Sequence, residues 1–301
     1  MIDITRPSRR QFLSRVAGLG VVGALSAPLA FSQDPSAGWQ IGCYTRPWAK
    51  FDYTVALDAI AEAGFSYVGL MTTNSPSHLV ISVDTTLEEA AQVGEACKAR
   101  NLAVPSIYGG GIPVHESLEA GIAGLRHLID NTEAAGATNL MMGGVTDQTQ
   151  HDPYYKAIAE CCGYAKEKGI GLSVKPHGGT NATGAELRAL IDSVGSDNFR
   201  VWYDPGNIFY YSDGALNPIE DAPTVDGLVV GMSVKDYLPP KVVDLTPGTG
   251  QVDFPAVMEK LKAGGFTGGP LIIECLAPGE LPQLLEEAKK ARAFVEELVG
   301  A

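Results

Sequence analysis

The sequence has few basic residues for its size. Its 301 residues include 22 Lys and Arg against 35 Asp and Glu, which gives a formal net charge of −13 at pH 7, and aromatic residues make up only 8% of the chain. A chain this acidic repels phosphate backbones, and no basic stripe interrupts the acidic background. We therefore expect no nucleic-acid partner.

The sequence also lacks a disulfide framework. Its five cysteines are an odd number and include no C-x-x-C pair. Two of them are adjacent within a helical pattern, so these two cannot both face one metal ion. We expect all five to be packing residues: Cys43, Cys97, Cys161, Cys162 and Cys275.

Long hydrophobic runs are absent beyond residue 32, and the first 32 residues have the pattern of an export signal. The segment 8–13 (SRRQFL) resembles a twin-arginine (Tat) motif, and an uncharged, glycine-rich apolar run follows over residues 16–29. A permanent anchor is the alternative, but the run is shorter than the ~20 residues of a comfortable span. We predict a Tat signal peptide over residues 1–32. The domain over residues 33–301 is then exported, periplasmic or extracytoplasmic, and without a membrane span after cleavage.

From residue 39 onward, short apolar runs alternate with longer segments of helical period. The strand-like runs are residues 40–44, 67–71, 103–107, 139–142, 171–175, 200–204, 229–234 and 271–275. The helical segments lie near residues 54–63, 86–100, 117–135, 153–168, 183–194, 218–224, 253–264 and 280–299. Because each intervening helix is about one crossover long, neighbouring strands are expected to be parallel.

Four helix ends share one turn, in which a glycine precedes a hydrophobic strand. These glycines are Gly64, Gly136, Gly169 and Gly265. The recurrence of this turn indicates that one type of βα unit is repeated along the chain. Eight such units over residues 33–301 match the size of a single (β/α)8 TIM barrel, an α/β fold. A doubly wound open sheet is the alternative. It would need a glycine-rich turn after the first strand, and residues 43–47 (CYTRP) contain none.

In such a barrel the active site lies at the carboxyl ends of the strands, so polar residues there are the candidates for chemistry. Strand alternation places Lys175 and His177 on one face at the fifth strand. It likewise places Ser233 and Lys235 on one face at the seventh strand.

Two carboxylates end apolar runs in the same region. Asp204 closes the sixth strand and Glu274 the eighth, where a carboxylate needs a cation or hydrogen bonds beside it. Since the strand ends meet at one mouth of a barrel, one cation there would satisfy both carboxylates.

The motifs around these residues resemble the xylose isomerase-like TIM barrels, a family that includes sugar phosphate isomerases and epimerases. The family-like segments are residues 175–179 (KPHGG), 203–207 (YDPGN), 234–236 (VKD) and 248–254 (GTGQVDF), and the likeness covers nearly the whole domain. The resemblance implies a small carbohydrate substrate. It also implies one divalent metal (Mn, Mg, Co or Zn), held by Glu, Asp, His and Glu at the ends of strands five to eight.

Two of those four ligand positions match this sequence. Asp204 and Glu274 stand at the second and fourth positions, whereas Lys175 and Ser233 stand where the family has Glu and His. His177 offers a replacement nitrogen, which gives a metal set of His177, Asp204 and Glu274. Alternatively, the Lys175 ammonium takes the place of the metal and pairs with the carboxylates, or the pairing is purely structural.

Five further residues near the strand ends are candidates for binding the sugar. They are Tyr44, Trp48, His115, Asn207 and Asp236. Tyr44 and Trp48 would form an apolar wall for a sugar ring, with core packing as the alternative. For His115 the alternative is a surface-loop position.

The leading hypothesis is an enzyme, a carbohydrate isomerase or epimerase or a related lyase, that abstracts a proton next to a sugar carbonyl. Glu274 would act as general base or metal ligand, Asp204 as ligand or acid, and His177 as ligand or proton carrier. Lys175 and Lys235 would stabilise the enediolate-like negative charge. The lysines favour an anion and export argues against a cytosolic phosphosugar, so an oligosaccharide fragment or an oxidised (keto) sugar is expected. The alternative is a catalytically degenerate barrel that binds a sugar or a partner.

Overall fold

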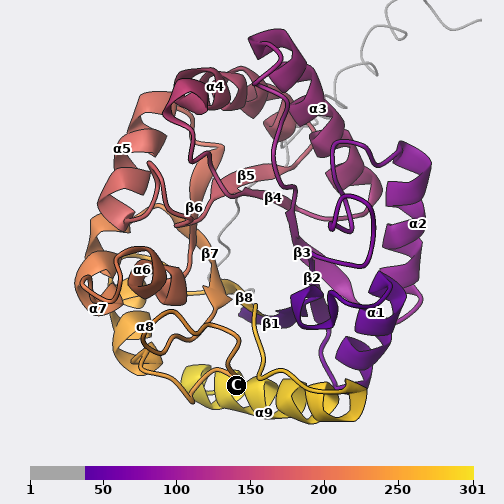
Figure 1. The fold of residues 1–301 in the computed structure, drawn as a ribbon, viewed down its shortest axis with the longest axis vertical. Helices are drawn as coiled ribbons and strands as arrows, with labels where there is room; N and C mark the ends of the chain where they lie inside the picture. The colour runs from indigo at the N-terminus through magenta and orange to yellow at the C-terminus, as the bar shows by residue number, and fades with distance from the viewer. Residues whose placement is uncertain (1–37) are drawn as a thin grey trace, which may run out of the picture.

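Eight parallel strands form a closed barrel in chain order from β1 to β8, and the helices surround it (Figure 1). The computed structural model describes residues 38–301, so the predicted signal peptide lies outside the described residues. Strand β8 closes the barrel against β1, with Gln40 paired to Pro270 and Cys43 paired to Ile273. The fold is the single (β/α)8 barrel that the sequence predicts.

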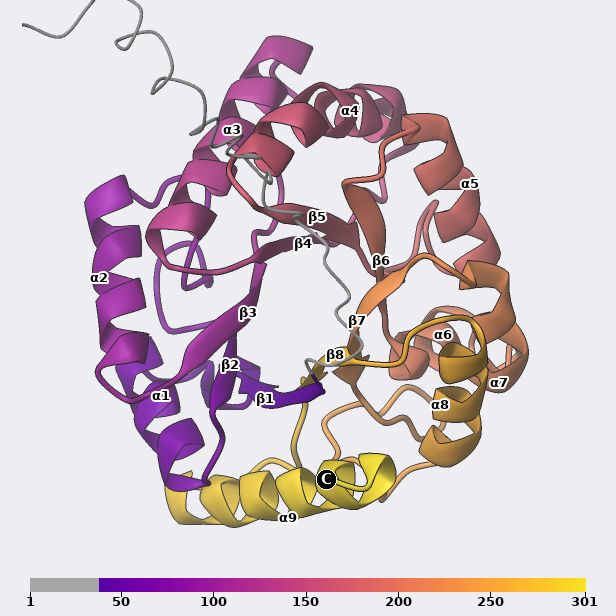
Figure 2. The ribbon, with the colours of Figure 1, turned by 180° about the vertical axis from the view of Figure 1, so that it is seen from behind.

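Each predicted strand lies within two residues of an observed one. The strands are β1 (Trp39–Tyr44), β2 (Tyr67–Leu70), β3 (Ala103–Tyr108), β4 (Asn139–Met142), β5 (Gly171–Val174), β6 (Phe199–Tyr203), β7 (Val229–Val234) and β8 (Gly269–Ile273). The helices, which Figure 2 shows from behind, are α1 (Tyr53–Glu62), α2 (Leu87–Lys98), α3 (Leu118–Ala134), α4 (His151–Glu167), α5 (Gly184–Val194), α6 (Pro205–Tyr211), α7 (Pro218–Asp221), α8 (Phe254–Ala263) and α9 (Leu281–Val299).

Helix α6 is an addition to the predicted elements, because the sequence pattern leaves residues 205–211 in a loop. The helix is short, and it begins directly after β6 with Asp204 as its N-cap and Pro205 in its first turn. The Asp204 carboxylate accepts a hydrogen bond from the backbone N–H of Asn207 at 2.9 Å. An Asp-Pro pair is a common helix start, so the signal was present although the apolar period was too short to reveal it.

The repeated glycine turn at the helix ends is confirmed. The four predicted glycines all have positive φ, with values of 87° at Gly64, 70° at Gly136, 72° at Gly169 and 100° at Gly265. A residue with a side chain rarely adopts this conformation, which explains why glycine recurs where each of these helices turns back into a strand.

Large side chains fill the interior of the barrel below the strand ends. Tyr44 pairs with Gly69 and Trp202 with Gly231 across neighbouring strands. A Cβ atom on Gly69 would lie 2.2 Å from the Tyr44 ring, and one on Gly231 would lie 2.4 Å from the Trp202 ring. The glycines therefore make room for two aromatic rings, and the barrel has a packed floor rather than a pore.

The five cysteines are buried and free, which confirms their expected role in packing. Within residues 38–301, the helices include none that is both long and apolar enough for a membrane span.

Candidate active site

Four charged side chains converge at the carboxyl end of the barrel. Lys175 follows β5, Asp204 follows β6, Lys235 follows β7 and Glu274 follows β8. Each stands two residues beyond an inward position of its strand, so the pleat carries these side chains toward the barrel axis. All four are buried, with exposed fractions between 0% and 6%.

The four side chains form one ion-pair network, which we call the lysine–carboxylate cluster (Lys175, Lys235, Asp204 and Glu274). Lys175 Nζ lies 2.6 Å from Glu274 Oε2 and 3.0 Å from Asp204 Oδ2, so one ammonium bridges both carboxylates. Lys235 Nζ lies 2.9 Å from Glu274 Oε1 and 4.0 Å from Asp204 Oδ2. The cluster has as many cations as anions, as charges in a buried position require.

Uncharged polar groups fix the orientation of the cluster. Ser233 Oγ donates a hydrogen bond to Glu274 Oε2 at 2.8 Å and accepts one from Trp202 Nε1 at 3.2 Å. The Asn207 side chain accepts a hydrogen bond from Lys235 Nζ at 2.9 Å, and its nitrogen donates at 2.6 Å to a backbone carbonyl after β5. Ser233 therefore acts here as a hydrogen-bond donor to Glu274.

Burial and ion pairing shift the pKa values of the cluster in opposite directions. Burial raises the pKa of Glu274, but the ammonium groups of Lys175 and Lys235 outweigh it and hold that pKa well below its usual range. Burial raises the pKa of Asp204, and the same ammonium groups offset only part of the rise. Burial lowers the pKa of Lys235, yet the two carboxylates outweigh it and raise that pKa. Glu274 is therefore an anion and Lys235 a cation at neutral pH.

The cluster lies at the base of a cavity of about 260 Å³ at the barrel mouth. This is slightly below the ~300 Å³ at which pockets for drug-sized ligands begin, so it suits a single small molecule. Lys175, Lys235 and Glu274 reach the cavity, whereas Asp204 lies behind them. The other lining residues are Arg46, Met71, Thr72, Tyr108, His177, Asn207, Tyr210, Tyr211 and Val243.

His177 contributes an imidazole to the wall of this cavity. Its ring lies between two tyrosine rings, with centroid distances of 6.3 Å to Tyr108 and 5.6 Å to Tyr211. Burial lowers the pKa of His177 to about 4, and the ammonium groups of Lys175 and Lys235 lower it in the same direction. The imidazole is therefore neutral at pH 7, when one ring nitrogen is able to accept a proton.

Arg46 adds a third cation to the wall of the cavity. It follows β1, contacts the thiol of Cys275 through its guanidinium, and lies 3.2 Å from the exposed carboxylate of Asp244. Arg46 and Glu274 also line a neighbouring cavity of about 210 Å³, so they separate the two spaces. The Arg46 side chain is 27% exposed and pairs with Asp244, so it stands outside the buried charge balance of the cluster. The described residues that line the cavity nevertheless carry three cationic groups and one carboxylate, a balance that suits an anionic ligand.

The donor set does not fit the metal that the family resemblance implies. Among residues 38–301, no three His, Cys, Asp or Glu side chains are grouped as a metal site requires, so the predicted set of His177, Asp204 and Glu274 is not assembled. The Lys175 ammonium instead lies between the two carboxylates. This geometry corresponds to the alternative in which Lys175 takes the place of the metal.

The remaining predicted residues fall into different places. Asn207 lines the cavity. Tyr44 lies deeper in the barrel, where its hydroxyl donates to Ser106 Oγ at 3.2 Å, and Trp48 packs in the core between barrel and helices. Neither aromatic side chain forms a wall of this cavity. The His115 side chain is 63% exposed in the loop after β3 and does not line the cavity either.

Asp236 organises a loop rather than the cavity. Its carboxylate is fully buried and accepts hydrogen bonds from the backbone N–H groups of Tyr237, Gly248, Gly250 and Val252, at 2.7 to 3.1 Å. These bonds hold the long segment between β7 and α8. Since Lys235 points inward, strand alternation already directs Asp236 away from the barrel axis.

Seven of the residues that line the cavity were not among the predicted ones: Arg46, Met71, Thr72, Tyr108, Tyr210, Tyr211 and Val243. Arg46 lies two residues after the end of β1 and Tyr108 ends β3, so the rule that polar residues at strand ends belong to the site would have found both. Tyr211 is the last residue of α6. The sequence carried no comparable signal for it, because this helix was not predicted.

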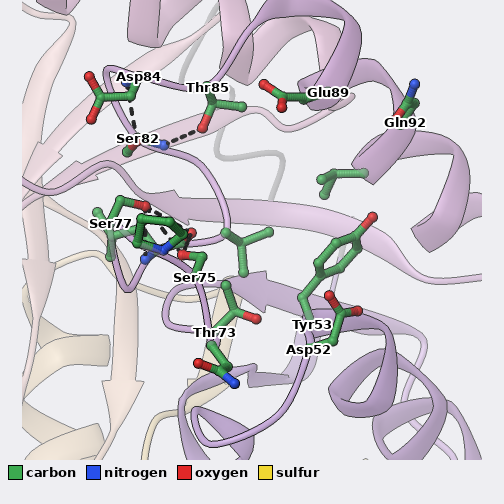
Figure 3. A pocket seen from close by; sticks show the side chains of 15 residues that line it. Asp52, Tyr53, Thr73, Ser75, Ser77, Ser82, Asp84, Thr85, Glu89 and Gln92 are labelled. Atoms are coloured by element: carbon green, nitrogen blue, oxygen red, sulfur yellow. Dashed lines mark hydrogen bonds between the residues drawn. The ribbon is translucent and has the colours of Figure 1, made fainter.

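A larger cavity, of about 420 Å³, lies beside the start of α1, the loop after β2 and α2 (Figure 3). Its carboxylates are those of Asp52, Asp84 and Glu89. Asp52 caps α1 by accepting from the N–H of Thr54, and Glu89 forms a capping box with Thr86 at the start of α2. Most of this polar lining is thus engaged in holding helix starts and the loop.

The family is established by the match of most of the chain. Residues 57–298 match the family of xylose isomerase-like TIM barrels. The chain therefore belongs to this family. A comparison with curated proteins found no match.

Solved structures share the fold over nearly their whole length. A xylose isomerase domain protein from Planctomyces limnophilus is 21% identical with a TM-score of 0.68, and the match covers 87% of this chain and 97% of that one. A D-psicose 3-epimerase solved in the presence of D-fructose is 14% identical with a TM-score of 0.69, covering 87% and 100%. A D-allulose 3-epimerase from Methylomonas sp. is 18% identical with a TM-score of 0.64, covering 87% and 98%. At these identities the likeness shows the shared fold.

Proposed function

We propose that this chain is a carbohydrate isomerase or epimerase, or a related lyase, that moves a proton on the carbon next to a sugar carbonyl. Its family and the sugar 3-epimerases that share its fold support the carbohydrate class. The observation that carries the proposal is that two buried ammonium groups, on Lys175 and Lys235, face a small cavity that also contains the neutral imidazole of His177.

The two lysines suit the stabilisation of negative charge. When a proton leaves the carbon next to a carbonyl, charge develops on the carbonyl oxygen, and fixed cations in a water-poor site stabilise that charge without reorganising. Glu274 and Asp204 hold the ammonium groups in place through the cluster. The expected part of Lys175 and Lys235 is therefore electrostatic.

The proton acceptor in this proposal is His177 rather than Glu274. Both Glu274 oxygens already accept hydrogen bonds from the lysines or from Ser233, so this carboxylate is engaged within the cluster. Within residues 38–301 the imidazole of His177 makes no such hydrogen bond, and its neutral form leaves one ring nitrogen able to accept a proton. We assign His177 the role of proton carrier and Glu274 the role of a positioning residue.

The surplus of positive charge narrows the substrate class. The described residues that line the cavity carry three cationic groups and one carboxylate, which favours a sugar that bears a carboxylate, or an oxidised (keto) sugar whose carbonyl becomes anionic during reaction. A cavity of about 260 Å³ has room for one sugar unit. The proposal includes export of the protein by the Tat signal over residues 1–32, which would place this activity outside the cytoplasm.

A sugar-binding barrel without catalysis is the second candidate. The observation that favours it is that Glu274, the one carboxylate among the described residues that line the cavity, already accepts hydrogen bonds at both oxygens. A binder would use the same cations and tyrosines to hold an anionic sugar, with no proton transfer.

Proton exchange with solvent separates the two candidates. The protein is incubated in D2O with neutral aldoses and ketoses, keto sugars and sugar acids, and NMR follows loss of the C–H signal next to the carbonyl. We expect exchange for at least one class, and a loss of about 10²-fold or more in folded His177→Asn and Lys235→Gln variants. The matched control Lys98→Gln removes an exposed lysine on α2 and should exchange as the wild type does. Sugar binding without exchange supports the binder, and neither binding nor exchange contradicts both candidates.

A further inference from the structure

We propose that the Lys175 ammonium is the permanent cation of this site. It occupies the position between Asp204 and Glu274 that a divalent metal would need, so the site operates without a metal there. The inference concerns the cluster itself and applies equally to an enzyme and to a sugar-binding barrel.

The first support is the occupancy of the carboxylate oxygens. Glu274 Oε2 accepts from Lys175 at 2.6 Å and from Ser233 at 2.8 Å, and Glu274 Oε1 accepts from Lys235 at 2.9 Å. Asp204 Oδ1 accepts from a backbone N–H of α6, whereas Asp204 Oδ2 accepts no hydrogen bond and has the Lys175 Nζ as an ion-pair partner at 3.0 Å. Three of the four carboxylate oxygens thus accept a hydrogen bond, and the fourth faces the Lys175 ammonium. A metal bonded to both carboxylates at the usual ~2.0–2.2 Å would have to displace the ammonium.

The second support is the charge cost of a metal beside the lysines. The Lys175 side chain is 2% exposed, so an ammonium that left the two carboxylates would lose both of its ion-pair partners in a buried position. A divalent ion would also add two positive charges beside Lys175 and Lys235, where the present charges already balance. Binding a metal would leave an uncompensated buried ammonium, which is strongly unfavourable.

The third support is the shortage of further ligands. Within residues 38–301, no third carboxylate, imidazole or thiol joins Asp204 and Glu274 in a group that could hold an ion. Ser233 is a neutral donor that is already bonded to Glu274. At the two places where a metal would need further ligands, the site thus has the Lys175 ammonium, which cannot bind a cation, and the Ser233 hydroxyl, which is a weak ligand.

A single substitution is expected to reverse this arrangement. Lys175→Glu removes the blocking ammonium and supplies a third carboxylate at the same place. The variant should bind Mn²⁺ more tightly than the wild type, because a higher ligand charge raises the affinity for divalent cations.

The experiment measures Mn²⁺ binding by calorimetry and by electron paramagnetic resonance on the purified full chain. The matched control is Lys98→Glu, which makes the same charge change at an exposed position on α2. We expect no saturable site in the wild type at millimolar Mn²⁺. We expect one site in Lys175→Glu that is at least about tenfold tighter than in the control, and loss of that site when Glu274→Gln is added.

Two results would overturn the inference. One is a stoichiometric Mn²⁺ site in the wild type that Asp204→Asn abolishes. The other is a folded Lys175→Glu variant that binds no better than Lys98→Glu. If circular dichroism shows that Lys175→Glu does not fold, the wild-type titration decides alone, since a saturable site that Asp204→Asn abolishes contradicts the inference and the absence of such a site supports it. These readouts require no turnover, so they stand whether or not the proposed activity is found.

Discussion

Substitution of Glu274 by Gln tests how much the lysine–carboxylate cluster contributes to the barrel. Glu274 is 2% exposed and accepts hydrogen bonds from Lys175, Ser233 and Lys235. Glutamine keeps one acceptor oxygen but presents an NH2 group to one of the lysines, and it leaves two buried ammonium groups with the single charge of Asp204. Removing one partner of a buried ion pair costs about 3–5 kcal/mol, and the retained acceptor places the expected loss near about 3 kcal/mol.

Urea unfolding, followed by circular dichroism, measures this loss. With an m-value near ~3 kcal/mol/M, the midpoint should fall by about 1 M. The control is Glu286→Gln, which breaks an exposed pair with Lys289 at 2.8 Å and should change stability by less than about 1 kcal/mol. If Glu274→Gln destabilised the protein no more than this control, the reasoning about a tightly paired buried cluster would be refuted.

Four further variants test other parts of the account. The pKa of His177 is lowered to about 4, against ~6.5 in an unfolded chain, so only the unfolded state binds this proton between those values. The free energy of unfolding should therefore fall by up to about 3 kcal/mol as the pH drops from ~6.5 to ~4, and His177→Asn should lose that part of the pH dependence in urea titrations. Arg46→Gln should weaken binding of sugar acids about tenfold and leave neutral sugars nearly unchanged in calorimetry, whereas equal effects would argue against an anion-binding role. Gly69→Ala should cost about 1–3 kcal/mol, because its Cβ would lie 2.2 Å from the Tyr44 ring. Gly163→Ala, which meets no atom within 4 Å in α4, should instead stabilise by about 0.5–1 kcal/mol in the same urea unfolding assay.

Local patterns in the sequence were sufficient to predict the fold and to place the four residues of the lysine–carboxylate cluster at the strand ends. The alternation of side chains within a strand is a local property, so it placed Lys235 inward and Asp204 at the end of an apolar run. The eight repeated units then fixed the barrel, which brings all strand ends to one mouth.

Other features depended on contacts between distant segments. Strand β5 ends at Val174, so the strand period no longer determines where His177 points, and the choice between an imidazole ligand and the Lys175 ammonium required coordinates. The place of Tyr44 depended on its fit against Gly69 of the neighbouring strand. Tyr211 joined the cavity through α6, a helix too short for its apolar period to reveal.

The most direct test of the account is a crystal structure of the protein soaked in Mn²⁺, with anomalous diffraction data. The account predicts that Lys175 Nζ remains in contact with both carboxylates, as in the distances of 2.6 Å to Glu274 and 3.0 Å to Asp204, and that no anomalous peak lies between them. An anomalous peak bonded to Asp204 and Glu274, with the Lys175 side chain displaced, would contradict it.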